Sequence, residues 1–286
     1  MRLRLPWQLK LVAKLLLSRL RLPYRLLAAL RMFRHGDMEN ADYALGVFEH
    51  HLVQSGLTSL QDKVCLELGP GDALTSALIA HAHGARQCYL VDAGAFASTD
   101  IGTYRVQSEQ LRASGMHAAD LADCHSVEAF LSATNSTYLT GGLESLRQLP
   151  DASIDFIWSH AVLEHVRLHE FDATLAELGR ILKPDGVCSH RIDLQDHLAA
   201  SLHNLRFRRE TWEKEWMARS GFYTNRVRFS DMVARFEAAG FCSALDKIDR
   251  WEILPVSRKA LNEEFAGLDD DELRVQGFDA VLRHPQ

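Results

Sequence analysis

Residues 64–72 of the chain read VCLELGPGD, and ALTSALIA follows at residues 73–80. The alternating apolar residues before Gly69 predict a short buried strand, and residues 73–80 have the apolar spacing of a helix. Gly69 and Gly71 bracket the turn between them, where a Cβ atom would obstruct the backbone. Such a turn lets a ligand lie against bare backbone at the helix N-terminus. The stretch therefore predicts a strand, a ligand-binding turn and a helix.

A second predicted strand supports this interpretation. Residues 89–92 read YLVD, an apolar strand that ends in Asp92 about twenty residues after the turn. At this spacing a doubly wound α/β fold places a carboxylate on a ribose diol. The turn has Leu74 where the dinucleotide pattern Gly-x-Gly-x-x-Gly has its third glycine, so a pyrophosphate-binding turn fits less well.

These residues together resemble a known signature. The pattern Glu67-x-Gly69-x-Gly71, followed by Asp92, is similar to the cofactor motif of class I methyltransferases (types 11 and 12) that depend on S-adenosylmethionine (SAM). SAM has no pyrophosphate, which agrees with the missing third glycine.

Two later blocks extend the resemblance over roughly residues 60–195. Residues 153–166 resemble the fourth strand of the family and the segment after it, and residues 178–187 resemble the entry to the fifth strand. The resemblance implies an α/β fold with a doubly wound, Rossmann-like, seven-stranded and mostly parallel sheet. It also implies N-terminal helices and a helical cap insertion at about residues 194–229.

The resemblance implies SAM as cofactor and assigns residues to it. In the family, the loop after the third strand carries an acid towards the adenine, but here that position is Gly142, with Leu143 beside it. Ser159 ends the predicted fourth strand, where open α/β sheets bind ligands. The predicted cofactor residues are Glu67, Gly69, Gly71, Asp92, Leu143 and Ser159.

Apolar periodicity outlines the remaining elements. Helices are predicted at residues 40–55, 104–113, 126–133, 171–182 and 230–239, and strands at 138–139, 154–158 and 187–192. Residues 241–251 and 277–283 are predicted to form a closing antiparallel pair, and residues 262–272 a polar connection.

Length and charge limit the class of protein. At 286 residues, one large domain at 36–286 is favoured, preceded by a basic amphipathic segment at 1–35. Residues 1–34 hold nine Lys or Arg and no acid, so a net charge of −6 leaves about −15 for the remainder. Most of the surface would repel a polyphosphate, which argues against a general nucleic-acid binder.

The basic N-terminal segment has two interpretations. Its charges interrupt every apolar run before the roughly 20 residues that a membrane span needs, and no signal-peptide cleavage pattern follows. It forms either a helix that lies on an anionic membrane surface or a helix packed on the domain with solvated basic residues. The first interpretation places the protein peripherally on the inner face of a membrane.

The five cysteines are scattered, without a Cys-x-x-Cys pair. Cys65, Cys88 and Cys188 fall in predicted strands and are expected to be reduced core residues of a cytoplasmic protein. A structural zinc site is not expected.

Methyl transfer from SAM is an in-line displacement, which requires aligned partners. A hydroxyl acceptor also needs a base for its proton or a metal that lowers its pKa. Histidine titrates near neutral pH, and a carboxylate can orient it. We expect His160 or His197 to be the base and Asp193 or Asp196 to be the orienting acid or a ligand.

A metal is the alternative to a base. Glu164 and His165 resemble part of a Glu-x-x-Glu-His run that is associated with a divalent ion in ubiquinone-pathway O-methyltransferases. Ala161 occupies the first position of that run, so one ligand is missing. The alternative interpretation of His165 is a residue that packs against a helix.

Basic and aromatic residues of the cap predict an anionic acceptor, because guanidinium groups bind carboxylate or phosphate bidentately. The predicted acceptor residues are His190, Arg206, Arg226 and Arg228. The cap and residues 220–226 look similar to methyltransferases of bacterial cell-surface polysaccharide pathways.

The sequence therefore predicts an O-methyltransferase that acts on a hydroxyl of a sugar, glycan or related anionic metabolite. Two alternatives remain: methylation of a quinone or phenolic lipid precursor, and a non-catalytic SAM-binding scaffold. A polar, arginine-lined pocket would favour the glycan, and an apolar, aromatic pocket would favour the prenylated ring.

Overall fold

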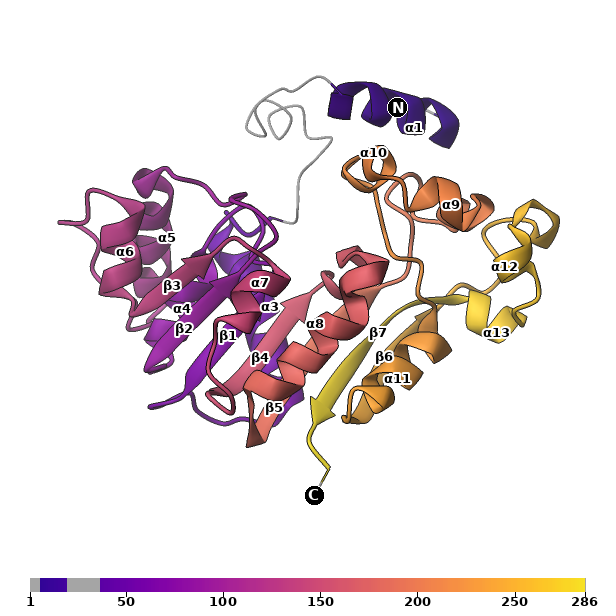
Figure 1. Cartoon of the computed structure of the whole chain (residues 1–286). Helices are drawn as coiled ribbons and strands as arrows, with labels where there is room; N and C mark the ends of the chain where they lie inside the picture. Colours follow the sequence, from indigo (N-terminus) through magenta and orange to yellow (C-terminus); the bar gives the residue numbers. More distant parts are fainter. Residues whose placement is uncertain (1–5, 20–36, 286) are drawn as a thin grey trace.

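The computed structural model describes residues 6–19 and 37–285 and contains one seven-stranded sheet, which confirms the predicted fold class (Figure 1). The strand order is β3-β2-β1-β4-β5-β7-β6. β1 to β5 are parallel, β7 is antiparallel to β5, and β6 is antiparallel to β7. The strands are β1 (Val64–Leu68), β2 (Gln87–Val91), β3 (Ser136–Leu139), β4 (Ile154–His160), β5 (Leu182–Asp193), β6 (Cys242–Arg250) and β7 (Val275–Arg283).

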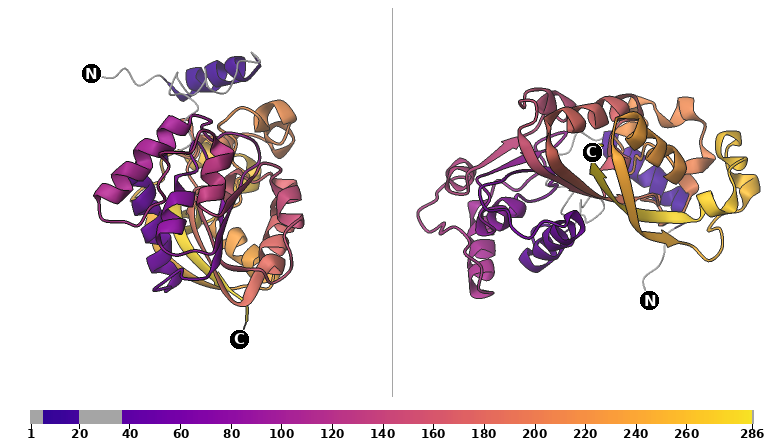
Figure 2. Two further views of the ribbon diagram at one scale, coloured as in Figure 1. Left: turned by 90° about the vertical axis from the view of Figure 1, so that its left-hand side faces the viewer. Right: turned by 90° about the horizontal axis from the view of Figure 1, so that it is seen from below.

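Helices cover both faces of the sheet (Figure 2). One face packs against α3 (Ala41–Ser55), α4 (Thr75–Ala82), α5 (Ile101–Ala113) and α6 (Val127–Ala133). The other face packs against α7 (Leu143–Arg147), α8 (Leu168–Ile181) and α11 (Phe229–Ala238). Every residue of β1 is buried, as expected for a parallel strand covered on both sides.

The ends of α3 follow from local chemistry. The side chain of Asn40 accepts hydrogen bonds from the backbone N–H groups of Asp42 and Tyr43, which satisfies two donors at the helix start. Gly56 ends the helix in the left-handed conformation, with φ of +74°. The predicted helix at residues 40–55 is thereby confirmed.

The predicted closing antiparallel pair is also confirmed, by β6 and β7. The prediction of a plain polar connection at residues 262–272 was wrong, because two short helices lie there, α12 (Glu263–Ala266) and α13 (Asp270–Leu273). Phe265 and Leu273 are buried in a small core with Leu202 and Leu205, and this burial orders the segment.

The segment at residues 194–229 follows β5 and contains only short helical turns. These turns are η2 (His203–Arg206), α9 (Arg209–Trp212) and α10 (Glu215–Ala218). Trp212 is fully buried at their centre, together with Met217 and Phe222. Two further short turns lie outside this segment, η1 (Leu163–His165) and η3 (Arg258–Ala260).

The first described helix, α1 (Trp7–Arg19), lies beside α10 (Figure 1). Among the described residues, no helix has the length and apolarity needed to cross a membrane. Six basic residues of the predicted N-terminal segment lie outside the described residues: Arg2, Arg4, Arg21, Arg25, Arg31 and Arg34. All five cysteines are free, and Cys65, Cys88 and Cys188 are buried in strands as expected.

Candidate active site

The glycine turn after β1 has the conformation that its sequence requires. Gly69 and Gly71 have φ of +75° and +71°, a region that residues with a Cβ atom rarely adopt. A Cβ atom on Gly69 would also lie 2.5 Å from a methyl group of Val162. The loop after β4 therefore packs directly on the bare backbone of the turn.

Asp92 follows β2 and is bonded to this turn. Its Oδ2 atom accepts from the backbone N–H of Gly71 at 3.2 Å, and Oδ1 accepts from Ala93 at 2.7 Å. Burial raises the pKa of Asp92 to about 6, against the lowering effect of these two N–H groups. A carboxylate has about four acceptor sites, so two remain for the hydroxyls of a ligand.

Glu67 projects from β1 beside Asp92 and is 3% exposed. Its Oε1 atom accepts from the indole N–H of Trp158 at 3.3 Å, but Oε2 has no hydrogen-bond partner among the residues that the structure describes. Burial raises the pKa of Glu67 to about 7, although the nearby side chains of Ser76 and Trp158 lower it. An unsatisfied buried carboxylate oxygen is costly, so the position suits a cationic ligand group.

The loop after β3 also reaches Asp92. The backbone N–H of Gly142 donates to the carbonyl of Asp92 at 2.8 Å, and Leu143 begins α7 next to it. The structure therefore brings the predicted cofactor residues Glu67, Gly69, Gly71, Asp92 and Leu143 to one edge of the sheet.

Ser159 does not join this group. Its hydroxyl lies 2.7 Å from Nδ1 of His190, and both residues are fully buried. Strand alternation turns Ser159 away from the face on which Trp158 and Glu67 meet. The expectations that Ser159 binds the cofactor and that His190 binds the acceptor are therefore corrected, because both side chains are buried in the core and Ser159 contacts Nδ1 of His190. Nε2 of His190 has no hydrogen-bond partner among the described residues.

His160 does share the face of Glu67. Glu67 pairs with Trp158 across the sheet, and His160 lies two residues further along β4, on the same side. At about 3.3 Å per residue, this places His160 about 7 Å further towards the carboxyl end of the strand. The cofactor residues and His160 are thus neighbours at the strand ends.

A cavity of about 390 Å³, here called the histidine pocket, opens beside His160. It lies where β7 and β6 extend the sheet beyond α3. It is lined by His50, His160, Arg191, Lys247, Ile248, Asp249 and Asp279.

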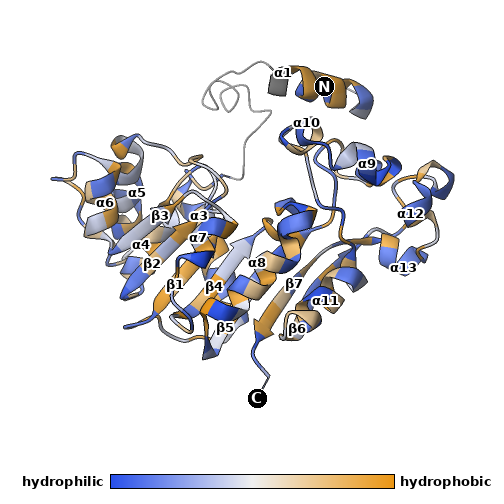
Figure 3. Ribbon diagram, viewed as in Figure 1, coloured by the Kyte–Doolittle hydropathy of each residue, from blue (hydrophilic) through white to orange (hydrophobic). Residues whose placement is uncertain are grey.

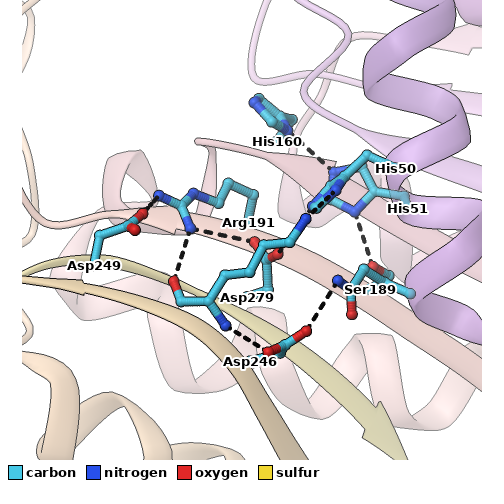
Figure 4. A network of polar contacts seen from close by, with 10 residues as sticks. His50, His51, His160, Ser189, Arg191, Asp246, Asp249 and Asp279 are labelled. Atoms are coloured by element: carbon cyan, nitrogen blue, oxygen red, sulfur yellow. Dashed lines mark hydrogen bonds and ion pairs between the residues drawn. The ribbon is translucent and has the colours of Figure 1, made fainter.

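A chain of two hydrogen bonds connects His160 to His51 and His51 to Ser189. Nδ1 of His160 lies 3.2 Å from Nε2 of His51, and Nδ1 of His51 lies 2.9 Å from the hydroxyl of Ser189 (Figure 4). The three residues come from β4, α3 and β5, and His51 is 1% exposed. Nε2 of His160 has no hydrogen-bond partner within residues 6–19 and 37–285.

Burial keeps this chain neutral. It lowers the pKa of His51 well below its usual value and the pKa of His160 to about 4. The neighbouring His50 and Arg191 lower both pKa values further. At neutral pH His160 therefore has an unprotonated ring nitrogen.

A second histidine of the pocket is paired with an acid. Nε2 of His50 lies 3.0 Å from Oδ2 of Asp279, and its Nδ1 lies 3.2 Å from Nζ of Lys247. Arg191 forms ion pairs with Asp249 and with Asp279. The pocket thus presents both cations and carboxylates (Figure 4).

In the structure Asp193 and Asp196 accept hydrogen bonds from backbone N–H groups, and none of these bonds comes from a histidine ring. Asp196 is 3% exposed and accepts from the backbone N–H groups of Leu198, Ala199 and His203, so it orders a turn. Asp193 accepts from the backbone N–H of Gln195. The histidine–carboxylate pair of this region is instead His50 with Asp279.

His197 is not a pocket residue either. Its Nε2 lies 3.0 Å from Nε2 of His165, whose Nδ1 donates to the carbonyl of Tyr223 at 2.7 Å. A carbonyl only accepts, so His165 has its proton on Nδ1 and accepts from His197. His197 thereby uses its Nε2 proton on His165, and the expectation that it is the base is corrected.

The predicted acceptor arginines lie away from the histidine pocket. Arg228 is 4% exposed and donates to the carbonyls of Leu194, Glu272, Leu273 and Val275. Arg226 donates to the carbonyl of Phe207 and lies between the rings of Trp212 and Phe265. Arg206 stacks over Trp7, with its guanidinium carbon 5.3 Å from the ring centroid. None of the three lines the histidine pocket.

The two weak metal candidates do not form a ligand set. Glu164 is 1% exposed, and burial raises the pKa of its carboxyl well above its usual value. His165 is bonded to Tyr223 and His197. In the part of the chain that the structure describes, no three His, Cys, Asp or Glu residues are arranged to hold a metal ion.

A second cavity, of about 600 Å³, lies between α9 and α12. Its lining residues are Arg208, Arg209, Glu210, Asn262, Glu263 and Glu264. No histidine is among these lining residues, so the cavity offers no neutral base. The histidine pocket is therefore the candidate acceptor site.

Comparisons with known proteins agree with this geometry. Residues 66–189 match the sequence model of a family described as a methyltransferase domain. The match spans less than half of the chain, and this segment is similar to a methyltransferase domain. The chain is therefore an enzyme, and SAM is its cofactor. A search of curated proteins found no matching sequence.

Solved structures of methyltransferases resemble the whole chain at low identity. A SAM-dependent methyltransferase from Archaeoglobus fulgidus is 11% identical, with a TM-score of 0.48 over 85% of this chain and 94% of that chain. Phosphoethanolamine N-methyltransferase 2 from Haemonchus contortus is 14% identical, with a TM-score of 0.48 over 84% and 53%. A 1,6-didemethyltoxoflavin-N1-methyltransferase from Burkholderia thailandensis is 12% identical, with a TM-score of 0.44 over 87% and 80%.

The residues of the glycine turn fit SAM. The unpartnered Oε2 atom of Glu67 suits a cationic group, and Asp92 retains acceptor sites for hydroxyls. SAM has an ammonium group and a ribose diol, which match these features.

Proposed function

We propose that this enzyme transfers the methyl group of SAM to a hydroxyl of a polyhydroxylated acceptor, such as a sugar, a glycan or a related anionic metabolite. The histidine pocket supports the proposal, because one of its lining residues, His160, ends the strand that pairs with β1 and is a neutral histidine with a free ring nitrogen.

The polarity of the pocket favours this acceptor over a quinone or phenolic lipid precursor. Of its seven lining residues, only Ile248 is apolar. Carboxylates such as Asp249 accept hydrogen bonds from hydroxyls, and Arg191 and Lys247 can donate to sugar oxygens or to an anionic substituent. An apolar ring would remove water from these charged groups without offering them a hydrogen bond, which is unfavourable.

Glu67, Asp92 and the glycine turn would hold SAM, which supplies a methyl group on a positively charged sulfur. The contribution of these residues is alignment, since a well-oriented intramolecular displacement avoids much of the entropy cost of bringing two molecules together. The loop after β4 joins the glycine turn to β4 through Val162, so the turn and His160 are held in one rigid unit.

His160 is the proposed base. When its Nδ1 proton is donated to His51, the Nε2 lone pair faces the pocket and can take the proton of the acceptor hydroxyl as the oxygen attacks the methyl group. A pKa near 4 keeps this nitrogen unprotonated throughout the neutral range. General base catalysis of this kind contributes roughly 10²- to 10⁴-fold.

We propose further that the enzyme works at the anionic inner surface of a membrane, on an acceptor that can be lipid-linked. The concentration of nine Lys or Arg residues within residues 1–34 supports this location.

The test is transfer of a labelled methyl group from SAM to cell-surface glycan extract, with a prenylated phenol as the competing acceptor. We expect label in the glycan as an alkali-stable methyl ether, and we expect His160→Gln to abolish it while SAM still binds. Glu263→Gln, in the second cavity, is the control and should leave transfer unchanged. Label found only in the prenylated phenol, or full transfer by His160→Gln, would reject the proposed acceptor or the proposed base.

A further inference from the structure

One face of the helix α1 packs on the segment at residues 194–229, here called the cap. Trp7, Leu11 and Leu15 contact the apolar cluster around Trp212. Trp7 also stacks on His203, with ring centroids 4.5 Å apart. This face fixes the rotation of the helix relative to the cap.

The two lysines of α1 lie on the packed side. Nζ of Lys10 donates to the carbonyl of Leu198 at 3.0 Å. Burial lowers the pKa of Lys14, and the charge of Lys10 lowers it further. The usual arrangement of a surface helix, with apolar residues inward and lysines outward, is therefore partly reversed.

Leucine and valine side chains lie on the opposite side of α1. Leu9, Val12 and Leu16 are 56%, 51% and 58% exposed. Their spacings of three and four residues place them in one stripe along the helix, here called the outer stripe. Figure 3 shows α1 as a largely hydrophobic helix at the periphery of the molecule. Single exposed apolar residues are ordinary, but a contiguous apolar stripe marks a contact surface.

The charge distribution indicates what the outer stripe contacts. Residues 1–34 contain nine Lys or Arg and no acid, whereas the remainder of the chain has a net charge of about −15. An anionic bilayer attracts the first part and repels the second, so electrostatics alone would orient the molecule with α1 towards the lipid. An exposed apolar helix face within a segment rich in Lys and Arg is typical of helices that lie in a membrane interface.

The length of α1 agrees with a surface location. Its 13 residues extend for about 20 Å, at 1.5 Å per residue, whereas the hydrocarbon core of a bilayer is about 30 Å thick. The helix can therefore lie in the interface with the outer stripe in the acyl boundary, while its other face stays on the cap.

We propose that Leu9, Val12 and Leu16 form the membrane-contacting face of this enzyme and that its partner is an anionic lipid bilayer. The inference rests on the membrane location proposed above and names the three residues that make the contact with the lipid. Because α1 is bonded to the cap that follows β5, docking brings the carboxyl end of the sheet, and with it the histidine pocket, to the lipid surface.

The experiment is co-sedimentation of the full-length protein with vesicles of phosphatidylcholine and phosphatidylglycerol at 3:1, and with vesicles of phosphatidylcholine alone. Leu9→Gln, Val12→Gln and Leu16→Gln combined leave the charge unchanged, and we expect them to lower partitioning onto the anionic vesicles at least tenfold. The control combines Val53→Gln, Val106→Gln and Ile253→Gln, which replace exposed apolar residues elsewhere, and it should partition like the wild type.

Two results would overturn the proposal. One is equal partitioning of the outer-stripe variant and the wild type. The other is a wild-type dimer in light scattering that the same variant converts to a monomer, with no vesicle binding by either protein, because the stripe would then contact a second copy. Circular dichroism confirms that the variant is folded. Methyl transfer to a soluble acceptor is measured in parallel, so a failed chemical assignment is distinguished from a failed membrane contact.

Discussion

His160 obtains its chemical character from residues that are distant in the sequence. Its Nδ1 atom is held by His51 of α3, and His51 is held by Ser189 of β5. A buried hydrogen-bonded chain of this kind fixes the orientation of a ring and restricts its tautomers. The role of His160 therefore depends on His51 as much as on its own position at the end of β4.

Replacing His51 tests this dependence. We expect His51→Leu to lower kcat about 10- to 100-fold, because His160 loses the acceptor for its Nδ1 proton, with little change in the KM for SAM. His51→Gln offers a carbonyl oxygen at a similar reach and should recover part of the loss. Steady-state kinetics with labelled SAM provides the measurement. Equal kcat values for His51→Leu and the wild type would show that His160 needs no such partner.

Asp92 is the proposed ribose ligand. Asp92→Ala removes both carboxylate oxygens, so we expect the affinity for SAM to fall at least tenfold, or about 1.4 kcal/mol. Titration calorimetry with SAM and with S-adenosylhomocysteine measures this directly. Asp246→Ala, on the exposed edge strand β6, is a matched control. Unchanged affinity in Asp92→Ala would contradict the assignment.

Arg228 shows how a residue suited to an anionic ligand can instead be part of the core. Arg228→Met would leave four carbonyls without their donor, and we expect it to lower the free energy of unfolding by about 3 kcal/mol. Arg219→Met, on an exposed side chain, should change it by less than about 0.5 kcal/mol. Urea denaturation followed by circular dichroism measures both. A loss of acceptor affinity without a loss of stability in Arg228→Met would restore its predicted binding role.

At the scale of elements, α1 and the cap form a single apolar unit that is separate from the main core. Trp7, Leu11 and Leu15 of α1 pack with Trp212, Met217 and Phe222. The core of the sheet is formed by other residues, so the two units can open independently.

Trp7→Ala tests this independence. Removal of the ring abolishes the stack on His203 and the contact with Arg206, so we expect amide exchange to accelerate at least tenfold in α1 and α10. Exchange in β1 and β4 should stay the same, because these strands are covered by helices on both faces. Hydrogen exchange with mass spectrometry resolves these segments. Faster exchange throughout the sheet would show instead that α1 is required for the whole fold.

At the scale of the whole molecule, buried histidines make stability depend on pH. The pKa of His160 is about 4 in the folded protein and about 6.5 in an unfolded chain. The unfolded state therefore binds the proton more readily between these values, and the free energy of unfolding falls as the pH is lowered from about 6.5 towards 4.

We expect the contribution of His160 to this loss to be about 2 kcal/mol between pH 7 and pH 5. Chemical denaturation of the wild type and of His160→Gln at both pH values measures it, since the variant lacks this part of the pH dependence. The buried His51 has a lowered pKa as well, so the variant should retain some loss of stability at low pH. Parallel pH dependences of the two proteins would show that His160 is protonated in the folded state at pH 5.

The sequence by itself determined the parallel core and the cofactor turn. VCLELGPGD and YLVD are local patterns, in which apolar alternation defines each strand and glycines define the turn, so neighbouring residues contain the necessary information. The helix at residues 40–55 and the closing antiparallel pair were predicted for the same reason.

Only the tertiary structure decided which polar residues form the histidine pocket. His51, His160 and Ser189 come from three elements, and Asp279 reaches His50 from a strand more than two hundred residues later in the chain. Sequence proximity suggested Asp193 and Asp196 as partners, but both accept backbone N–H groups of their own loop. Burial is a property of the packed molecule, and for this reason it determined that Arg228 and His190 belong to the core and that Leu9, Val12 and Leu16 lie at the surface.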